Sequence, residues 1–142
     1  MEEQNAGRWF TADFGTFRQY VLSGDPDMKD TVLLAFPEQG GEPAGLVSFY
    51  YRFSFYRTRP ILSMRSLFVA PAFRGRKVGQ LLVRDVMRRG LDKGCCGMGW
   101  DIFPDNEGAT RFYDRLGLKP DADRFVHYWA DETQMKEFVS GA

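Results

Sequence analysis

The stretch Leu67–Leu82, LFVAPAFRGRKVGQLL, decides the fold of this chain. Its apolar start is typical of a buried strand, its middle is a short basic loop, and from Val78 its apolar residues recur at helical spacing. A strand, a tight loop and a helix start in this order direct several backbone N–H groups to one place, which favours a bound phosphate. Arg74, Arg76 and Lys77 add positive charge there. The stretch therefore predicts a site for a ligand that carries a pyrophosphate.

The composition predicts one globular domain over residues 1–142. Hydrophobic residues make up 44% of the chain and charged residues 27%, which suits a single apolar core. The 19 Lys and Arg residues balance the 19 Asp and Glu residues, which argues against binding of nucleic acid or of a membrane surface. No apolar run is long enough to cross a bilayer and the first residues are polar, so a cytoplasmic location is expected.

The two cysteines, Cys95 and Cys96, are adjacent in the sequence. Neighbouring cysteines form a disulfide only with strain, so both are expected to be reduced, in keeping with a cytoplasmic location. Together with His127, the one histidine, they cannot complete a four-ligand zinc set, and no metal is expected. Packing in the core or at a strand edge is the favoured role, and a reactive thiol is the alternative.

The hydrophobic pattern along the chain predicts a mixed sheet with helices packed on it. Helices are expected at 11–23, from Val78 to Gly90 or Gly94, from Asn106 to Gly117, and at Asp131–Val139. Strands are expected at Thr31–Phe36, Gly45–Phe55, Pro60–Val69, Gly97–Phe103 and Phe125–Ala130, with a hairpin around 56–59. Antiparallel strands followed by a strand–helix–strand–helix unit favour the α+β class.

Two motifs in this order resemble the GCN5-related N-acetyltransferase (GNAT) superfamily. The first is Arg74–Gly79, RGRKVG, which is similar to the family's phosphate loop of Gln or Arg, two residues, Gly, one residue, then Gly or Ala. The second comprises these residues: Asn106, Ala109, Phe112, Tyr113 and Leu116–Leu118. The resemblance covers about Val32 to Trp129 and implies the family's fold, a central, mostly antiparallel mixed sheet flanked by helices. The family's first strand is expected to be missing, and the sequence leaves open whether the chain is naturally short or truncated.

The resemblance implies acetyl-coenzyme A (acetyl-CoA) as the co-substrate. By this resemblance, main-chain groups of one strand would pair with the pantetheine arm, amides of the basic loop would hold the pyrophosphate, and residues of the second motif would also contact the coenzyme. The implied coenzyme-binding residues are Leu67, Phe68, Val69, Arg74, Gly75, Arg76, Lys77, Val78, Gly79, Gln80, Asn106, Ala109 and Tyr113. The two central strands are expected to part after Val69 and to open a slot for the thioester. A plain N-cap is the second interpretation of Asn106.

The family's chemistry is direct attack of an amine on the thioester. Tyr113 is the implied general acid that protonates the leaving thiolate, because a phenol with a pKa of about 10 keeps its proton at neutral pH. The alternative is that Tyr113 only packs in the core. Asp101 is the candidate base, with a surface carboxylate as the equal alternative. His127 has a suitable pKa for this task but is more typical of a structural residue at its position.

The diamine (spermidine/spermine) acetyltransferase branch is the most similar part of the family. The aromatic run Leu46–Tyr56 and the segment Asp101–Asn106, DIFPDN, carry this likeness. That branch has a Glu-Asp pair where this chain has Arg65 and Ser66, which, with Asp101, are the candidate acceptor-binding residues. An arginine there favours an acceptor with a carboxylate over a polyamine, although a solvated strand residue is the equal alternative.

These features predict an N-acetyltransferase that moves the acetyl group of acetyl-CoA to a primary amine of a small molecule. A homodimer is expected through the exposed face of the aromatic strand. The alternative is a non-catalytic acyl-CoA-binding or regulatory module, which is favoured by Lys77 in place of the loop's middle glycine, since glycine serves where φ is positive. A kinase-type phosphate site is disfavoured because the loop lacks the Gly-Lys-Ser/Thr ending.

Overall fold

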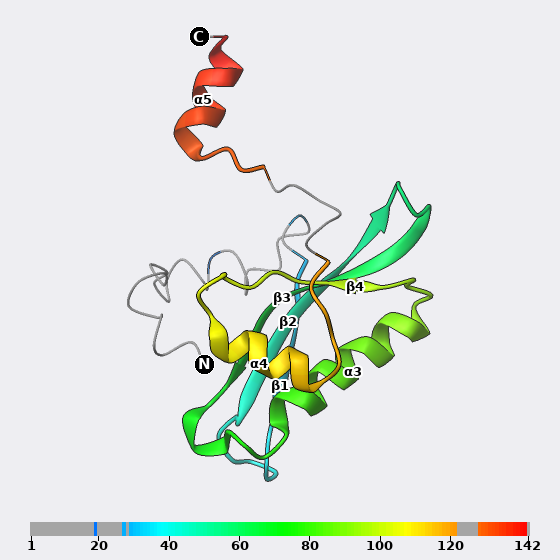
Figure 1. Ribbon diagram of the computed structural model, residues 1–142, viewed down its shortest axis with the longest axis vertical. Helices are drawn as coiled ribbons and strands as arrows, with labels where there is room; N and C mark the ends of the chain where they lie inside the picture. Colours follow the sequence, from blue (N-terminus) through cyan, green and yellow to red (C-terminus); the bar gives the residue numbers. More distant parts are fainter. Residues whose placement is uncertain (1–18, 20–26, 28, 122–127, 142) are drawn as a thin grey trace.

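One four-stranded sheet lies at the centre of the described part of the chain, residues 19, 27, 29–121 and 128–141 of a computed structural model (Figure 1). Its strands, in spatial order, are β1 (Thr31–Ala35), β2 (Gly45–Ser54), β3 (Arg59–Val69) and β4 (Met98–Gly99). The first three are antiparallel, and β4 runs parallel to β3. The mixed sheet confirms the predicted α+β class.

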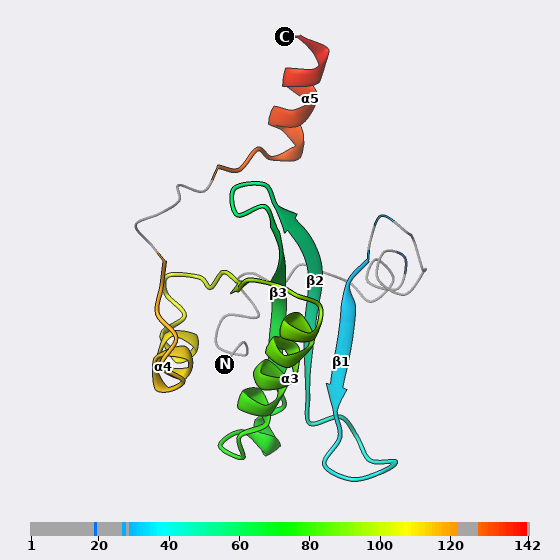
Figure 2. The ribbon, with the colours of Figure 1, turned by 90° about the vertical axis from the view of Figure 1, so that its right-hand side faces the viewer.

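Of the described helices, α3 covers one face of the sheet. A 3₁₀ turn, η1 (Pro71–Phe73), leads into α3 (Val78–Asp92), and α4 (Glu107–Arg115) and α5 (Glu132–Ser140) follow. Figure 2 shows α3 against one face of the sheet, α4 on the β3 side, and α5 standing away from the rest. Among the described residues, no helix has both the length and the apolar character needed to cross a membrane.

The core lies between the sheet and α3. Alternate residues of β2 and β3 point to the same face, as strand geometry requires, and the α3 stripe meets them. The buried cluster contains Val47, Phe49, Leu62, Met64, Leu82, Val83, Val86, Cys95, Ala109 and Tyr113. The helical spacing that predicted α3 is therefore the spacing of the residues that pack on the sheet.

The predicted elements differ from the observed ones mainly around β4. The expected strand Gly97–Phe103 is reduced to Met98–Gly99. Directly after it, the Trp100 ring packs 4.9 Å from the Tyr113 ring of α4, measured between centroids. The segment after Gly99 no longer pairs with β3, because Trp100 packs against α4 instead.

The other described elements begin and end within about two residues of expectation, except for the final expected strand. α3 passes through Gly90 and ends at Asp92, and Gly94, with a φ of 81°, makes the turn that follows. The expected helix 11–23 lies almost wholly outside the described residues, as do positions 125–127 of the final expected strand. The described residues 128–130 are not in a strand, so the strand prediction is wrong for them.

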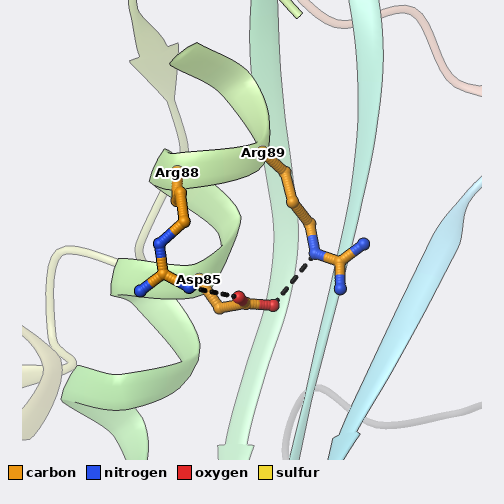
Figure 3. A network of polar contacts seen from close by, with 3 residues as sticks. All are labelled: Asp85, Arg88 and Arg89. Atoms are coloured by element: carbon orange, nitrogen blue, oxygen red, sulfur yellow. Dashed lines mark hydrogen bonds and ion pairs between the residues drawn. The ribbon is translucent and has the colours of Figure 1, made fainter. Parts of the chain in front are cut away.

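The outer face of α3 carries a small ion-pair network (Figure 3). The Asp85 carboxylate accepts hydrogen bonds from Arg89 Nε at 2.9 Å and from Arg88 at 3.3 Å. The Asp85–Arg89 pair has the i,i+4 spacing read from the sequence. All three side chains are at least partly exposed to solvent, so the network adds little to stability and leaves the opposite face of α3 to the core.

Gly45 offers a test of how closely β2 and β3 approach each other. A Cβ at this position would lie 2.7 Å from the Phe68 carbonyl oxygen, which is backbone and cannot swing aside. We expect Gly45→Ala to lower the free energy of unfolding by about 1–3 kcal/mol in chemical denaturation. Gly99→Ala is the matched control, because a Cβ there would meet nothing within 4 Å. Equal stability of the two variants would contradict the close approach.

Candidate functional site

The helix α3 begins without a side-chain cap. Its N-cap residue is Lys77, whose side chain makes no capping hydrogen bond, and the first turn holds no acidic residue. The first backbone N–H groups of a helix lack helical partners, and the helix dipole adds partial positive charge at the same end. This helix start is therefore suited to an anion.

The loop before α3 bends through two left-handed residues. Gly75 has a φ of 73° and Lys77 a φ of 64°. The position of Lys77 thus has the backbone shape for which glycine is favoured, and a lysine there costs roughly 1–2 kcal/mol. The lysine keeps the loop geometry at this cost while adding a cation at its tip.

A cavity of about 490 Å³ opens beside this helix start. It is bounded by the end of β3, the loop, the first turn of α3 and one side of α4. Its lining residues are Leu67, Phe68, Val69, Phe73, Arg74, Gly75, Lys77, Val78, Gly79, Gln80, Phe112, Arg115 and Leu116. The three predicted strand residues and all the predicted loop residues except Arg76 are among them.

The charge of the cavity lining is positive. Arg74, Lys77 and Arg115 line it, and no Asp or Glu does so within the described residues. Arg74 Nε also donates a hydrogen bond to the Val69 carbonyl at 3.1 Å, which ties the loop to the end of β3. Arg76 turns aside, with its guanidinium carbon 5.6 Å from the Phe73 ring centroid.

Four lining residues were missed by the sequence reasoning: Phe73, Phe112, Arg115 and Leu116. The last three share one side of α4, at i, i+3 and i+4, so helical spacing was the available signal. Contact between α4 and α3 brings them in: a Cβ on Gly79 would lie 3.2 Å from the Phe112 ring. The glycine at position 79 is therefore needed for this close packing.

The parting of the two central strands differs from the prediction. Pairing of β3 with β4 ends at Ser63 and Gly99, well before Val69. The expectation that the strands separate after Val69 was wrong, because Trp100 packs toward α4. From Met64 to Val69, β3 faces no paired strand on its β4 side within the described part of the chain.

Tyr113 lies in the core rather than on the cavity wall. Its ring contacts those of Trp100 and Phe112, with centroids 4.9 and 5.0 Å away, and the residue is 8% exposed. It is not among the residues that line the cavity. Its expected role as an acid stays a prediction.

Asn106 is the N-cap of α4, which was one of the two roles that the sequence suggested for it. Its side-chain oxygen accepts a hydrogen bond from the Ala109 backbone N–H at 3.1 Å. Ala109 is buried, and neither residue lines the cavity. Any contact of this pair with a coenzyme stays a prediction.

The candidate acceptor residues lie on β3 and after β4. Ser48 pairs with Ser66 and Phe49 with Met64, which leaves Arg65 as the extra residue of a bulge. The Arg65 guanidinium pairs with the Asp30 carboxylate at 3.0 Å and lies 4.4 Å from the Tyr50 ring centroid. Its side chain remains 58% exposed. Ser66 and Asp101 are exposed too.

The two cysteines are free thiols, as predicted. Burial, followed by the neighbouring Cys96, raises the pKa of the Cys95 thiol, which outweighs the opposite effect of Arg59 and Lys93. A thiol with a raised pKa is a poor nucleophile at neutral pH. This finding favours packing over the alternative of a reactive thiol.

Comparison with known proteins gives relatives that share part of the chain. An aminoglycoside N(6')-acetyltransferase type 1 of Salmonella typhimurium is 33% identical over 69 residues, 49% of this chain and 47% of the relative. A thialysine N-epsilon-acetyltransferase of Caenorhabditis elegans is 32% identical over 77 residues, 54% of this chain and 48% of the relative. The matches thus span about half the length of these curated relatives.

Solved structures share the fold. An integron cassette protein from the mobile metagenome of V. cholerae superposes with a TM-score of 0.78 at 17% identity, over 90% of this chain and 78% of that one. The aminoglycoside N-acetyltransferase AAC(6')-Iy, solved in complex with CoA, superposes with a TM-score of 0.60 at 26% identity, over 70% of this chain and 75% of that one.

A family profile extends the likeness beyond these segments. The profile of the Acetyltransferase (GNAT) family matches residues 2–118, which include β1 to β4, α3 and α4. The matched part contains the uncapped helix start, the basic loop and the parted strands described above. The chain therefore belongs to the GNAT acetyltransferase family.

Proposed function

We propose that this chain transfers the acetyl group of acetyl-CoA to a primary amine of a small molecule, by direct attack within a ternary complex. The observation that carries the proposal is the uncapped start of α3, flanked by Arg74 and Lys77, opening on a cavity that continues to Leu67. Helix N–H groups and cations suit a pyrophosphate. Relatives named for acetylating aminoglycosides and thialysine support a small amine as acceptor.

The residues present fit the pyrophosphate and the pantetheine arm of acetyl-CoA. The pyrophosphate would meet the amides from Arg74 to Gln80, and Arg115 on α4 supplies a further cation for the phosphates. The pantetheine arm would lie along β3 from Leu67 to Val69 as an added strand, because no strand of the described residues pairs with that edge. The coenzyme supplies an acetyl thioester that an amine can attack.

Two residues are proposed to move protons. Tyr113 donates a proton to the leaving thiolate, since a phenol is protonated at neutral pH. Asp101 accepts the proton that an ammonium substrate must lose before attack, directly or through water. Asp101 lies two residues after the end of β4, just beyond the point where pairing with β3 stops.

The second candidate function is a non-catalytic acyl-CoA-binding module. The observation that favours it is the position of Tyr113, buried in the core and absent from the cavity lining. Both functions require coenzyme binding, and only the first releases a thiol. Calorimetry with CoA, followed by thiol release from acetyl-CoA with a panel of amines, separates them. Binding without thiol release for any amine would support the module.

A homodimer stays part of the proposal. The hairpin between β2 and β3 presents Phe53, Phe55 and Tyr56, which are 52%, 86% and 84% exposed. Exposed aromatic side chains in a group are typical of contact surfaces. They are the part of the aromatic strand that a second copy would cover.

Lys77 separates the effect of loop strain from that of charge. We expect Lys77→Gly and Lys77→Ala to weaken CoA binding about equally, by roughly fivefold in calorimetry, because both remove one cation from the pyrophosphate site. Only Lys77→Gly should raise the thermal midpoint, because glycine adopts the left-handed backbone without strain. Tighter CoA binding by Lys77→Gly than by the wild type would contradict the role of the charge.

Tyr113→Phe tests the proposed acid. The variant keeps the ring contacts with Trp100 and Phe112, so CoA affinity should stay near wild type, and circular dichroism verifies that it folds. We expect kcat for thiol release to fall about 100-fold or more. Tyr51→Phe, a hydroxyl loss on β2, is the matched control. An unchanged kcat in Tyr113→Phe would remove this residue from the reaction.

Arg65 and Asp30 test the class of acceptor. Because Asp30 already pairs with the guanidinium, Asp30→Asn should free Arg65 and lower KM for amines that carry a carboxylate, whereas Arg65→Gln should raise it. Each change is expected to be about three- to tenfold, the scale of a partly exposed charged contact. KM for diamines should move little in Arg65→Gln. A wild-type preference for spermidine over carboxylate-bearing amines would contradict this assignment.

A further inference from the structure

A second cavity, of about 390 Å³, lies at the other end of α3 from the coenzyme site. Its wall is made by the last turn of α3, the segment that leads into β4, and the residues after α4. The lining residues are Leu62, Met87, Gly90, Leu91, Cys95, Cys96, Gly97, Met98, Trp100, Leu118 and Lys119. None of these residues lines the coenzyme cavity.

Four of the residues that line this cavity contain sulfur. Cys95 and Cys96 bring two thiols, and Met87 and Met98 bring two thioethers. The lining contains no Asp, Glu or His, so it offers nothing to the cations that prefer oxygen or imidazole. In the described ranges no three His, Cys, Asp or Glu side chains gather to hold a metal ion. What distinguishes this cavity is therefore its combination of two thiols with two thioethers.

The backbone of the thiol segment is held in place. Cys95 N–H donates to the Gly90 carbonyl and Cys96 N–H to the Pro60 carbonyl, both at 2.9 Å. The left-handed Gly94 sets the turn just before them. The backbone of the two cysteines is therefore tied to both α3 and the start of β3.

We infer that this sulfur-lined cavity binds one soft monovalent cation, Cu(I) or the chemically similar Ag(I). Thiolate and thioether sulfur are the donors that select such ions. Binding forms two metal–thiolate bonds and breaks two S–H bonds, with two protons released to solvent and no change in oxidation state. The product carries one negative charge, which the nearby Arg59, Lys93 and Lys119 would stabilise.

Anaerobic titration of the full chain with Cu(I), in competition with a bathocuproine chelator, tests the inference. The wild type should hold one Cu(I) per chain, and Cys95→Ser with Cys96→Ser should abolish binding. Two adjacent thiols alone could bind Cu(I), so the thioethers decide the case. Met87→Leu with Met98→Leu should weaken binding about tenfold or more, while Met135→Leu, an exposed methionine of α5, should leave it unchanged.

Two further measurements show whether the variants are folded and whether Cu(I) binds in this cavity. Leucine replaces methionine at nearly constant volume, so the double variant should fold, as circular dichroism would verify. Trp100 lines the cavity, so its fluorescence should fall on Cu(I) binding and this change should disappear in Trp100→Phe. Wild-type protein that loses Cu(I) to the chelator, or a double methionine variant that binds as tightly as the wild type, would overturn the inference.

Discussion

The contact between the Trp100 and Tyr113 rings is the constraint on which the rest of the molecule depends. It draws the chain from the end of β4 toward α4, so β4 contributes only two residues to the sheet. Among the residues that the structure describes, no strand pairs with β3 on this side from Met64 to Val69. A strand edge with free hydrogen-bonding groups ordinarily pairs with another chain or is covered. Here the open edge leads directly into the cavity at the start of α3.

The same packing explains why the cavity is basic on two sides. Gly79 lets α4 approach α3 closely through Phe112, and Arg115 then faces the loop that carries Arg74 and Lys77. The loop accepts a strained, left-handed lysine where glycine would be easier. Strain of this kind persists where the surrounding structure holds it in place. In return for this backbone strain, Lys77 adds one positive charge at the site expected to meet the pyrophosphate.

The helix α3 joins two regions of different chemistry. Its first turn offers N–H groups and cations, whereas its last turn meets thiols and thioethers in an apolar wall. Between them, Leu82, Val83 and Val86 are buried against the sheet and hold the helix on it. The Asp85 network on the outer face contributes little to stability (Figure 3). The position of both cavities therefore follows from how one helix lies on the sheet.

The sequence by itself determined the elements whose signals are local. The strand before Pro71, the basic loop, α3 and its i,i+4 pair, and the Asn106 cap of α4 all follow from spacing or from short-range hydrogen bonds, and the structure contains each of them. The tertiary structure decided the parting of β3 from β4, the arrival of Arg115 at the cavity, the burial of Tyr113 and the pairing of Arg65 with Asp30. These features join residues far apart in the chain. Helical spacing shows which side of α4 a residue is on, but not which distant residues that side will meet.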